Sequence, residues 1–293
     1  MDVTWLPDAQ RRPRRLAVGE FDGVHLGHRE VMRGADTVLT FEPHPLAVVA
    51  PHAVPRLLTS LEAKTDLVAG LGMRELVVIP FDGAFAAQSP QAFIDDTLVR
   101  DLGATEVSIG ENFRFGKLAG GDPEMLEADD RFKTRVVRLA EADGEVVSSA
   151  HIRGLIAGGA IQYAGELLGD PFVLDGEVLH GDKRGRDLGY PTANLEPLPG
   201  YIVPSHGVYA CRVRIGDEWH AAATNVGVRP QFKTGRGELI EAYLIDWEGD
   251  IYGETIRIEF TKRLRGEKRF ESVDGLIEQM GTDVQDTREI LGC

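Results

Sequence analysis

Short apolar runs alternate with segments of helical apolar spacing over roughly the first half of the chain. Five runs are suited to buried strands: 16–19, 37–41, 75–81, 105–110 and 135–140. Between them, residues 60–72 and 89–103 each begin at Ser, carry apolar residues at i, i+3 and i+4, and end at Gly, which are helix signals. This alternation predicts a parallel sheet covered on both faces. The first crossover, residues 19–37, leaves room for only about two helical turns.

The pattern changes after residue 150. Residues 151–169 predict a helical connector, and the strand-like stretches that follow are separated by Gly, Pro and Asp turns: 172–180, 207–215, 218–227, 239–246 and 255–260. Closely spaced strands without crossover helices predict an antiparallel β-barrel. Near the end, Ser272 can cap a helix whose apolar stripe is Val273, Leu276, Ile277, Met280 and Val284. The fold class is therefore α/β plus all-β, with domains at 1–167 and 168–293.

Composition narrows the choice of partners. The chain of 293 residues has 47 acidic and 32 Lys and Arg side chains, a formal net charge of −15. Nucleic acid is thus not expected as a partner, because phosphate contacts need a basic face. The chain contains no apolar run of about 18 residues, so no membrane span is predicted. The N-terminal stretch lacks the apolar segment of a signal peptide. Two cysteines, Cys211 and Cys293, give no disulfide framework, so we expect a cytoplasmic protein. Self-association stays open.

The stretch AVGEFDGVHLGHREV, residues 17–31, places His25 and His28 in a glycine-rich turn after an apolar run. Such a turn, between a parallel strand and a helix, is a typical phosphate site, because glycine allows close approach to backbone N–H groups. Imidazoles there can donate hydrogen bonds to charge that develops on phosphate. The alternatives are a metal pair or structural turn histidines. The metal pair lacks a third ligand.

Further motifs follow in order along the chain. They are TFEPHP (40–45), GENFRFG (110–116), SSAHIR (148–153), HGDKRGRDLGYPTAN (180–194), GVYA (207–210), NVGVRP (225–230), EAYLID (241–246) and LRGEKRFES (264–272). Together with the glycine turn, this ordered set resembles the prokaryotic bifunctional riboflavin kinase/FAD synthetase family. The resemblance covers nearly the whole chain. It implies a Rossmann-like nucleotidyltransferase domain followed by a β-barrel riboflavin kinase domain.

The resemblance implies two reactions on small-molecule substrates. Riboflavin is phosphorylated by ATP to FMN in the second domain, and FMN is adenylylated by a second ATP to FAD, with release of pyrophosphate, in the first. Mg²⁺ accompanies ATP. Two other functions stay open: a riboflavin kinase with a slow or degenerate adenylyltransferase domain, and a non-catalytic flavin or nucleotide sensor.

In the first domain the resemblance assigns charge stabilisation to His25 and His28. The ATP and phosphate contacts would come from Gly19, Phe21, Asp22, Gly23, Gly27 and Arg153, and the flavin contacts from His44, Asn112, Phe113 and Arg114. Four of these assignments have a plain alternative. Asp22 can cap the helix, His44 can be a structural turn histidine, Phe113 can pack in the core, and Arg153 can be a solvated surface arginine.

In the second domain Thr192 and Asn194 offer hard oxygen ligands suited to Mg²⁺, although a Pro-Thr turn is the alternative. The resemblance gives Glu241 the general-base role on the 5′-hydroxyl of riboflavin. The loop residues Gly181, Lys183, Arg184, Gly185 and Arg186 can fold over ATP phosphates, or form a solvated hairpin.

The chain departs from the family pattern at four positions. Ala150 replaces the usual threonine of a Ser-Ser-Thr, and His151 stands where a basic residue is common. Gln231 and Tyr243 replace a usual threonine and histidine in the kinase half. The first two departures, with the short first crossover helix, bear on adenylyl transfer, whereas the last two lie at less essential positions of the kinase half.

Overall fold

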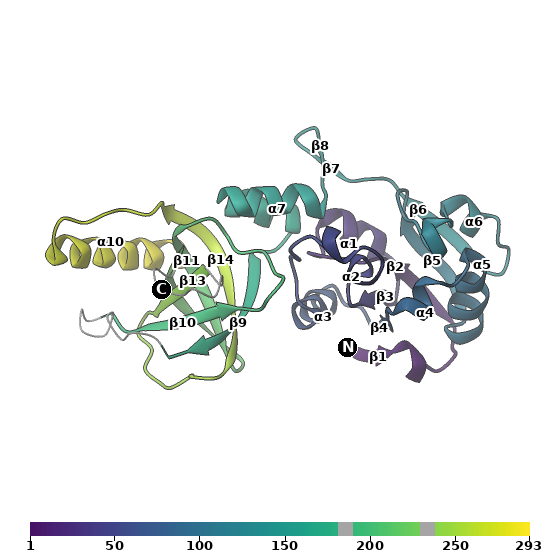
Figure 1. Ribbon diagram of the computed structural model, residues 1–293, viewed down its shortest axis with the longest axis horizontal. Helices are drawn as coiled ribbons and strands as arrows, with labels where there is room; N and C mark the ends of the chain where they lie inside the picture. Colours follow the sequence, from purple (N-terminus) through teal and green to yellow (C-terminus); the bar gives the residue numbers. More distant parts are fainter. Residues whose placement is uncertain (181–189, 229–237) are drawn as a thin grey trace. The chain divides into compact units, whose positions relative to one another are not determined.

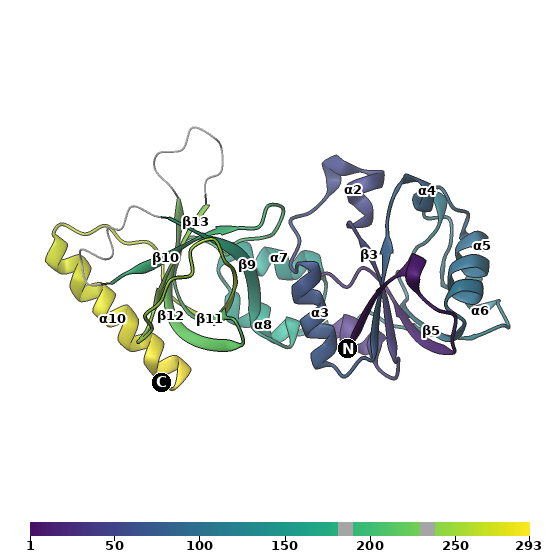
Figure 2. The ribbon, with the colours of Figure 1, turned by 90° about the horizontal axis from the view of Figure 1, so that it is seen from below.

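The computed structural model describes residues 1–180, 190–228 and 238–293, which form two compact units (Figures 1 and 2). Unit 1 comprises Met1–Pro55 and Leu61–Ser149, and unit 2 comprises Arg56–Ser60 and Ala150–Cys293. The helices α7 (Ser149–Gly158) and α8 (Ile161–Leu168) therefore belong almost wholly to unit 2. The predicted boundary between residues 167 and 168 stays a proposal about where an active kinase fragment begins.

Unit 1 contains a six-stranded sheet in which every neighbouring pair is parallel. The spatial order is β1 (Asp2–Trp5), β4 (Glu75–Pro80), β3 (Thr37–Glu42), β2 (Arg14–Val18), β5 (Ala104–Gly110) and β6 (Lys133–Val137). The predicted parallel sheet is confirmed. The sequence did not reveal β1, because this edge strand is short and largely exposed and so carries no buried apolar run.

Short helices connect these strands, and the crossover helix α1 has only seven residues, as expected. Figure 1 shows α1 and α3 on one side of the sheet and α5 and α6 on the other. The helical segments are α1 (Leu26–Met32), α2 (Pro45–Val49), α3 (Leu61–Gly70), α4 (Gly83–Ala86), α5 (Pro90–Ala92), the π-helical η3 (Phe93–Asp101), α6 (Pro123–Glu127), and the 3₁₀ turns η1 (Leu6–Asp8), η2 (Pro51–Ala53) and η4 (Lys117–Ala119). A small hairpin joins β7 (Glu141–Ala142) to β8 (Glu145–Val146).

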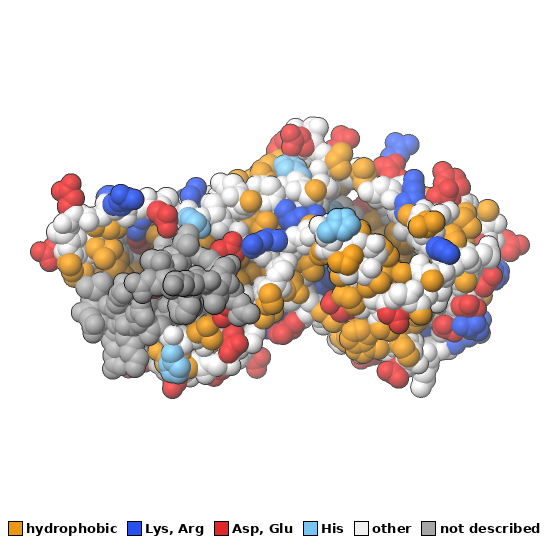
Figure 3. Space-filling model, in the orientation of Figure 1, with side chains coloured by type: hydrophobic (Ala, Val, Ile, Leu, Met, Phe, Trp, Pro, Cys, Tyr) orange, Lys and Arg blue, Asp and Glu red, His pale blue; other side chains and the backbone are white. Residues whose placement is uncertain are grey.

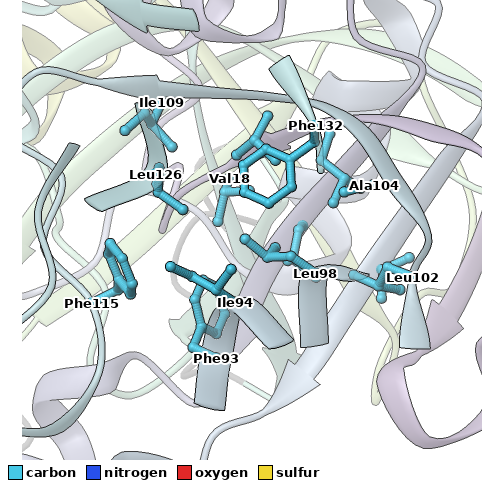
Figure 4. Close-up of a cluster of buried hydrophobic side chains, with 14 of the residues drawn as sticks. Val18, Phe93, Ile94, Leu98, Leu102, Ala104, Ile109, Phe115, Leu126 and Phe132 are labelled. Atoms are coloured by element: carbon cyan, nitrogen blue, oxygen red, sulfur yellow. The ribbon is translucent and has the colours of Figure 1, made fainter. Parts of the chain in front are cut away.

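Successive strand residues of unit 1 enter two different hydrophobic clusters. Leu16 and Val18 belong to one cluster, whereas Ala17 belongs to the other. In Figure 4 the labelled side chains of the first cluster, among them Ile94 and Leu98 of η3, converge with Val18 of β2. Because successive strand side chains point to opposite faces, both faces of the sheet are buried. The strands therefore read as continuous apolar runs.

The strand order reverses beside β2. From β2 the chain proceeds through β3 to β4 on one side, and then returns to place β5 on the other side of β2. In open α/β sheets ligands bind at the carboxyl ends of the strands where the order reverses. The glycine turn leaves the end of β2, and the segment of Asn112 leaves the end of β5, so both lie at this point.

Unit 2 is a closed six-stranded antiparallel barrel, as predicted. Its order is β10 (Thr192–Pro197), β13 (Glu238–Leu244), β12 (Glu218–Val228), β11 (Gly207–Ile215), β14 (Thr255–Arg265) and β9 (Phe172–Leu179). The terminal helix α10 (Val273–Leu291) is capped by Ser272, whose hydroxyl accepts from the N–H of Gly275, and it packs on β11 and β12. The Pro-Thr turn considered for residues 191–194 is not observed, because Thr192 begins strand β10.

The surface carries both signs of charge. Acidic side chains are spread over the visible face of both units, with basic ones between them (Figure 3). In the three described ranges no helix is both long and apolar enough to cross a lipid bilayer.

Candidate active sites

The glycine turn between β2 and α1 has an unusual backbone. Phe21, Gly23 and Val24 have φ values of 55°, 91° and 45°, so two side-chain-bearing residues occupy the left-handed region that favours glycine. A Cβ at Gly19 would lie 2.9 Å from Cε1 of Phe21. The ring of Phe21 therefore folds back over Gly19, and the turn is fixed in a strained shape. Alternating backbone conformations of this kind create the concave N–H surfaces that bind anions.

His25 and His28 are held together in this turn. The Nδ1 atom of His25 accepts a hydrogen bond from the N–H of His28 at 3.3 Å and so caps α1. The two imidazoles stack with 3.5 Å between their centroids, and the ring of Phe21 meets His28 edge-on at 5.4 Å. A Cβ at Gly27 would lie 3.2 Å from Cε1 of His25, so only glycine leaves that ring undisturbed. The structure brings these predicted residues together.

Both imidazoles are neutral near pH 7. Burial lowers the pKa of His25 to about 4. Burial, together with the charges of His25 and Lys64, lowers the pKa of His28 well below its usual value. Because Nδ1 of His25 is an acceptor, its proton lies on Nε2, which is then a hydrogen-bond donor. The Nδ1 atom of His28 is buried and has no hydrogen-bond partner among the described residues.

Asp22 lies in the same turn and is buried. The cap of α1 is His25, so the expected alternative role of Asp22 as a helix cap is not observed. The backbone oxygen of Asp22 accepts a hydrogen bond from the hydroxyl of Ser149 at 2.8 Å. The Ser-Ser-Ala segment that departs from the family pattern therefore touches the glycine turn directly, one residue before Ala150.

The predicted flavin contacts lie after neighbouring strands. His44 follows β3, and its Nδ1 accepts from the N–H of Leu46 at 3.1 Å, which makes it the cap of α2. Asn112 and Arg114 are exposed after β5. Phe113 is half-buried, stacks on Phe115 with 5.7 Å between centroids, and packs against the first hydrophobic cluster. Core packing of Phe113 is thus observed, whereas flavin contacts of these residues stay predictions.

Two other sets of predicted phosphate ligands are located differently. Arg153 lies in α7 and belongs to unit 2, so its contact with the phosphate turn stays a prediction. The loop residues Gly181, Lys183, Arg184, Gly185 and Arg186, and also the departure Gln231, lie outside the described residues.

In the barrel, Glu241 stands in a row of polar side chains across three adjacent strands. The register pairs Glu241 of β13 with Asn194 of β10 on one side and with Asn225 of β12 on the other. Directly paired residues share a face, and residues two apart along a strand share it too, so Thr192 lies on this face as well. Their neighbours Leu195, Ile240, Ala242 and Val226 are buried in the barrel core, so the polar row is on the opposite face. The structure therefore brings Thr192, Asn194 and Glu241 together.

Asn225 is a site residue that the sequence did not single out. Its Nδ2 donates a hydrogen bond to Oε2 of Glu241 at 3.4 Å. The motif NVGVRP contains this asparagine, but only the strand register shows that it meets Glu241. The departure Tyr243 follows two residues later on the same strand face, where its ring meets Tyr190 edge-on at 5.1 Å between centroids.

Two family models match the chain. Residues 8–151 match a family described as FAD synthetase, and residues 168–291 match a family described as riboflavin kinase. A curated relative from Listeria monocytogenes, named bifunctional riboflavin kinase/FMN adenylyltransferase, is 39% identical over 286 residues, covering 93% of this chain and 91% of the relative. A relative of the same name from Bacillus subtilis is 38% identical over 287 residues, covering 92% and 90%.

The chain belongs to the bifunctional riboflavin kinase/FMN adenylyltransferase family. The resemblance inferred from the ordered motifs is confirmed. A solved structure from Streptococcus pneumoniae, described as a macrolide-efflux protein, has the same fold with a TM-score of 0.86 and 30% identity, covering 98% of this chain and 99% of that one. The domains of both activities are thus present along one chain.

Proposed function

We propose that the glycine turn of unit 1 is the site that adenylylates FMN, and that the polar row around Glu241 in unit 2 is the site that phosphorylates riboflavin. The observation that carries this assignment is that the two motif sets fold at two different places. One lies at the strand-order reversal beside β2, and the other across β10, β13 and β12. Family membership supplies the two activities.

At the glycine turn, a phosphate oxygen of FMN attacks the α-phosphorus of ATP. A new P–O bond forms, the bond to the bridging oxygen breaks, and pyrophosphate leaves without any net proton transfer. Catalysis then depends on alignment and on stabilising charge that develops on the α-phosphate. The Nε2–H of His25 and the ring of His28, fixed by their stacking, supply neutral donors for that charge.

At the polar row, the 5′-hydroxyl of riboflavin attacks the γ-phosphorus of ATP, its proton passes to the carboxylate of Glu241, and ADP leaves. Asn225 donates to Oε2 of Glu241, which fixes the orientation of the carboxylate. The neighbouring Asn194 is buried beside Glu241.

The donor set beside Glu241 fits Mg²⁺. The hydroxyl of Thr192 and the amide oxygen of Asn194 are hard oxygen ligands on the face of Glu241, and Mg²⁺ is usually shared between one or two such ligands and substrate phosphates. Outside the two ranges that the structure does not describe, no group of three or more His, Cys, Asp or Glu side chains is placed to hold a metal ion. Mg²⁺ bound by Thr192 and Asn194 would neutralise charge on the ATP phosphates.

The experiment that tests the proposal separates the reactions in one sample. Purified protein is incubated with riboflavin, Mg²⁺ and ATP, and riboflavin, FMN and FAD are then quantified. Both products support the bifunctional assignment. FMN alone indicates a kinase with a degenerate first domain, and Ala150→Thr is then expected to restore FMN-dependent pyrophosphate release. If neither FMN nor FAD forms, the protein is a non-catalytic sensor.

We also propose a cytoplasmic location, where ATP and riboflavin are available together. Cys211 is buried and Cys293 is exposed, and both thiols are free, as a reducing compartment requires.

A further inference from the structure

A buried lysine lies directly beneath the glycine turn. The Nζ atom of Lys64, in α3, donates to the backbone oxygen of Glu20 at 2.7 Å and to the hydroxyl of Thr40 at 3.3 Å. The hydroxyl of Thr40 donates to the same backbone oxygen at 3.0 Å. The side chain of Lys64 is 4% exposed. A cation that has been removed from water is therefore tied to the first residues of the phosphate-binding turn.

Glu20 is the counter-ion of Lys64, but only one of its two carboxylate oxygens is paired among the described residues. Oε1 of Glu20 lies 3.5 Å from Nζ of Lys64, but Oε2 is buried and has no hydrogen-bond partner in the described part of the chain. Glu75, at the start of β4, shows the contrast. Arg14 donates to both of its oxygens, at 2.7 Å and 3.0 Å, and Arg12 adds a third bond at 2.7 Å. Glu75 is thus fully paired at the amino end of the sheet, whereas Glu20 is half-paired at the end that binds ligands.

The surroundings of Glu20 favour proton binding near neutral pH. Burial raises the pKa of Glu20 to about 7; the charge of Lys64 opposes this shift, and the charges of Asp22 and Glu42 add to it. The charge of Lys64 is also felt at His28. The histidines are neutral, so the protonation state of Glu20 decides whether the charge of Lys64 is cancelled.

We propose that Lys64 and Glu20 are positioning residues of the adenylyl-transfer site, Lys64 as its buried cation and Glu20 as a proton-dependent counter-ion that sets the affinity of the turn for polyphosphate. The inference rests on the proposed adenylylation at the glycine turn. With Glu20 protonated, one positive charge remains beneath the turn. With Glu20 ionised, the pair is neutral and the turn holds ATP and the FMN phosphate less tightly.

Glu20→Gln, which keeps the shape and removes the ionisation, tests the pair directly. The KM for ATP in FMN-dependent pyrophosphate release is measured for both proteins at about pH 6 and about pH 8, either side of the titration. Substrate phosphates also titrate near pH 6, so the variants are compared at each pH. At about pH 8 we expect the KM of Glu20→Gln to be lower than that of the natural protein, on the order of fivefold. At about pH 6 the two values should coincide. Equal KM values at both pH values would overturn the proposal.

Lys64→Met alone leaves an unpaired carboxylate and is expected to be unstable. The double variant Glu20→Gln/Lys64→Met is neutral and keeps the volume. Relative to the natural protein, its KM should match at about pH 8 and be higher at about pH 6, because its charge beneath the turn is absent at every pH. A double variant with the low KM of Glu20→Gln would show that the charge of Lys64 is irrelevant. Glu75→Gln is the matched control, since it removes a buried, paired carboxylate at the far end of the sheet. It should lower thermal stability without changing the KM for ATP at either pH.

A second readout does not depend on turnover. ATP binding is measured calorimetrically near pH 7 in two buffers of different ionisation enthalpy, without FMN or riboflavin, to count the protons taken up. The natural protein should take up more protons than Glu20→Gln, because bound phosphate favours the protonated carboxyl; ATP at the kinase site contributes equally to both. Equal uptake overturns the proposal. If the natural protein makes no FAD but the difference in uptake is found, the adenylylation assignment fails while the Lys64–Glu20 pair stands.

Discussion

The imidazoles of His25 and His28 stack with 3.5 Å between centroids and 18° between ring planes, and they are joined through the bond from the N–H of His28 to Nδ1 of His25. Two donors are therefore held as one rigid block at the strand-order reversal. Since both are neutral, they can donate to phosphate without first losing a counter-ion. This relationship underlies the first prediction.

His28→Ala should reduce FAD formation from FMN by on the order of 10²-fold, because a single donor to developing charge contributes about 3 kcal/mol to the transition state. FMN formation from riboflavin should not change, since the barrel does not contain His28. Pyrophosphate release and FMN formation are measured on the same samples. Robust FMN-dependent release from the variant would remove the imidazole from the chemistry.

Gly27→Ala tests whether the placement of His25 matters. The new Cβ would lie 3.2 Å from Cε1 of His25, so the ring must shift by a few tenths of an ångström. Alanine is a better helix former than glycine by about 1 kcal/mol, so the helix is not expected to weaken. We expect adenylylation to fall about tenfold through kcat, because misplaced catalytic groups lose alignment.

Gly70→Ala is the control for this variant. Gly70 is the last residue of α3, and a Cβ added there would meet no neighbouring heavy atom within 4 Å. It should leave adenylylation unchanged. A Gly27→Ala protein as active as Gly70→Ala would mean that the ring of His25 can move without cost.

Glu241→Gln should lower the kcat of riboflavin phosphorylation by roughly 10²-fold or more, because it keeps the shape but removes the proton acceptor. Asn225→Ala should lower kcat less, about tenfold, with little change in KM, since it frees the carboxylate to rotate. Glu218→Gln, an exposed position at the start of β12, is the control. Near-normal FMN production by Glu241→Gln would refute the general-base assignment.

Much of this arrangement could be predicted from the sequence. The parallel sheet was predictable because burial on both faces produces continuous apolar strands, as at 75–81. The phosphate turn was predictable because its glycines and histidines are adjacent in the chain. Strand β10 was not predictable, since Thr192–Pro197 contains a single large aliphatic residue and ends in proline.

Contacts made only in three dimensions explain the remaining omissions. Lys64 is 44 positions from Glu20 and sits inside an ordinary amphipathic helix pattern, so no local signal distinguishes it. Asn225 meets Glu241 only because the register of β12 against β13 places them opposite one another. Residue type and spacing identify a turn, but they do not identify the side chains that support it from other strands and helices.

The buried histidines also predict a pH dependence of stability in unit 1. The folded pKa of His25 is about 4, below its unfolded value of 6.5, so at intermediate pH the unfolded state binds more protons than the folded state. Stability therefore rises with pH between about 4 and 6.5; protonating the buried imidazole of His25 costs on the order of 3 kcal/mol below about pH 4, and this cost is absent at neutral pH. The half-buried Glu20 acts with the opposite sign, because its folded pKa is raised to about 7 and stability therefore falls as pH rises through that range.

His25→Asn isolates this contribution, since asparagine remains a good helix cap but does not titrate. Hydrogen exchange of unit 1 peptides is measured at several pH values from about 4 to about 7. The natural protein should lose protection more steeply than the variant as pH falls. Parallel profiles would mean that His25 is not neutral in the folded state.

The last prediction concerns the boundary of the kinase. A fragment beginning at Leu168 retains the barrel, and we expect it to make FMN but no FAD. It lacks helix α8, however, whose Ile161, Ala164 and Leu167 are buried and which contacts β9 and β14. Loss of such side chains costs about 2 to 5 kcal/mol for each large aliphatic residue. A fragment beginning at Ala150 keeps both α7 and α8 and should unfold at a higher temperature while phosphorylating riboflavin at the same rate.

Both fragments lose Ser60, whose hydroxyl donates to Asp175 in its buried ion pair with Arg257, so the comparison isolates the two helices. Thermal unfolding and FMN formation are measured side by side. Equal unfolding temperatures would show that the helices do not stabilise the barrel, and a folded but inactive fragment beginning at Ala150 would show that phosphorylation requires residues that precede Ala150 in the chain.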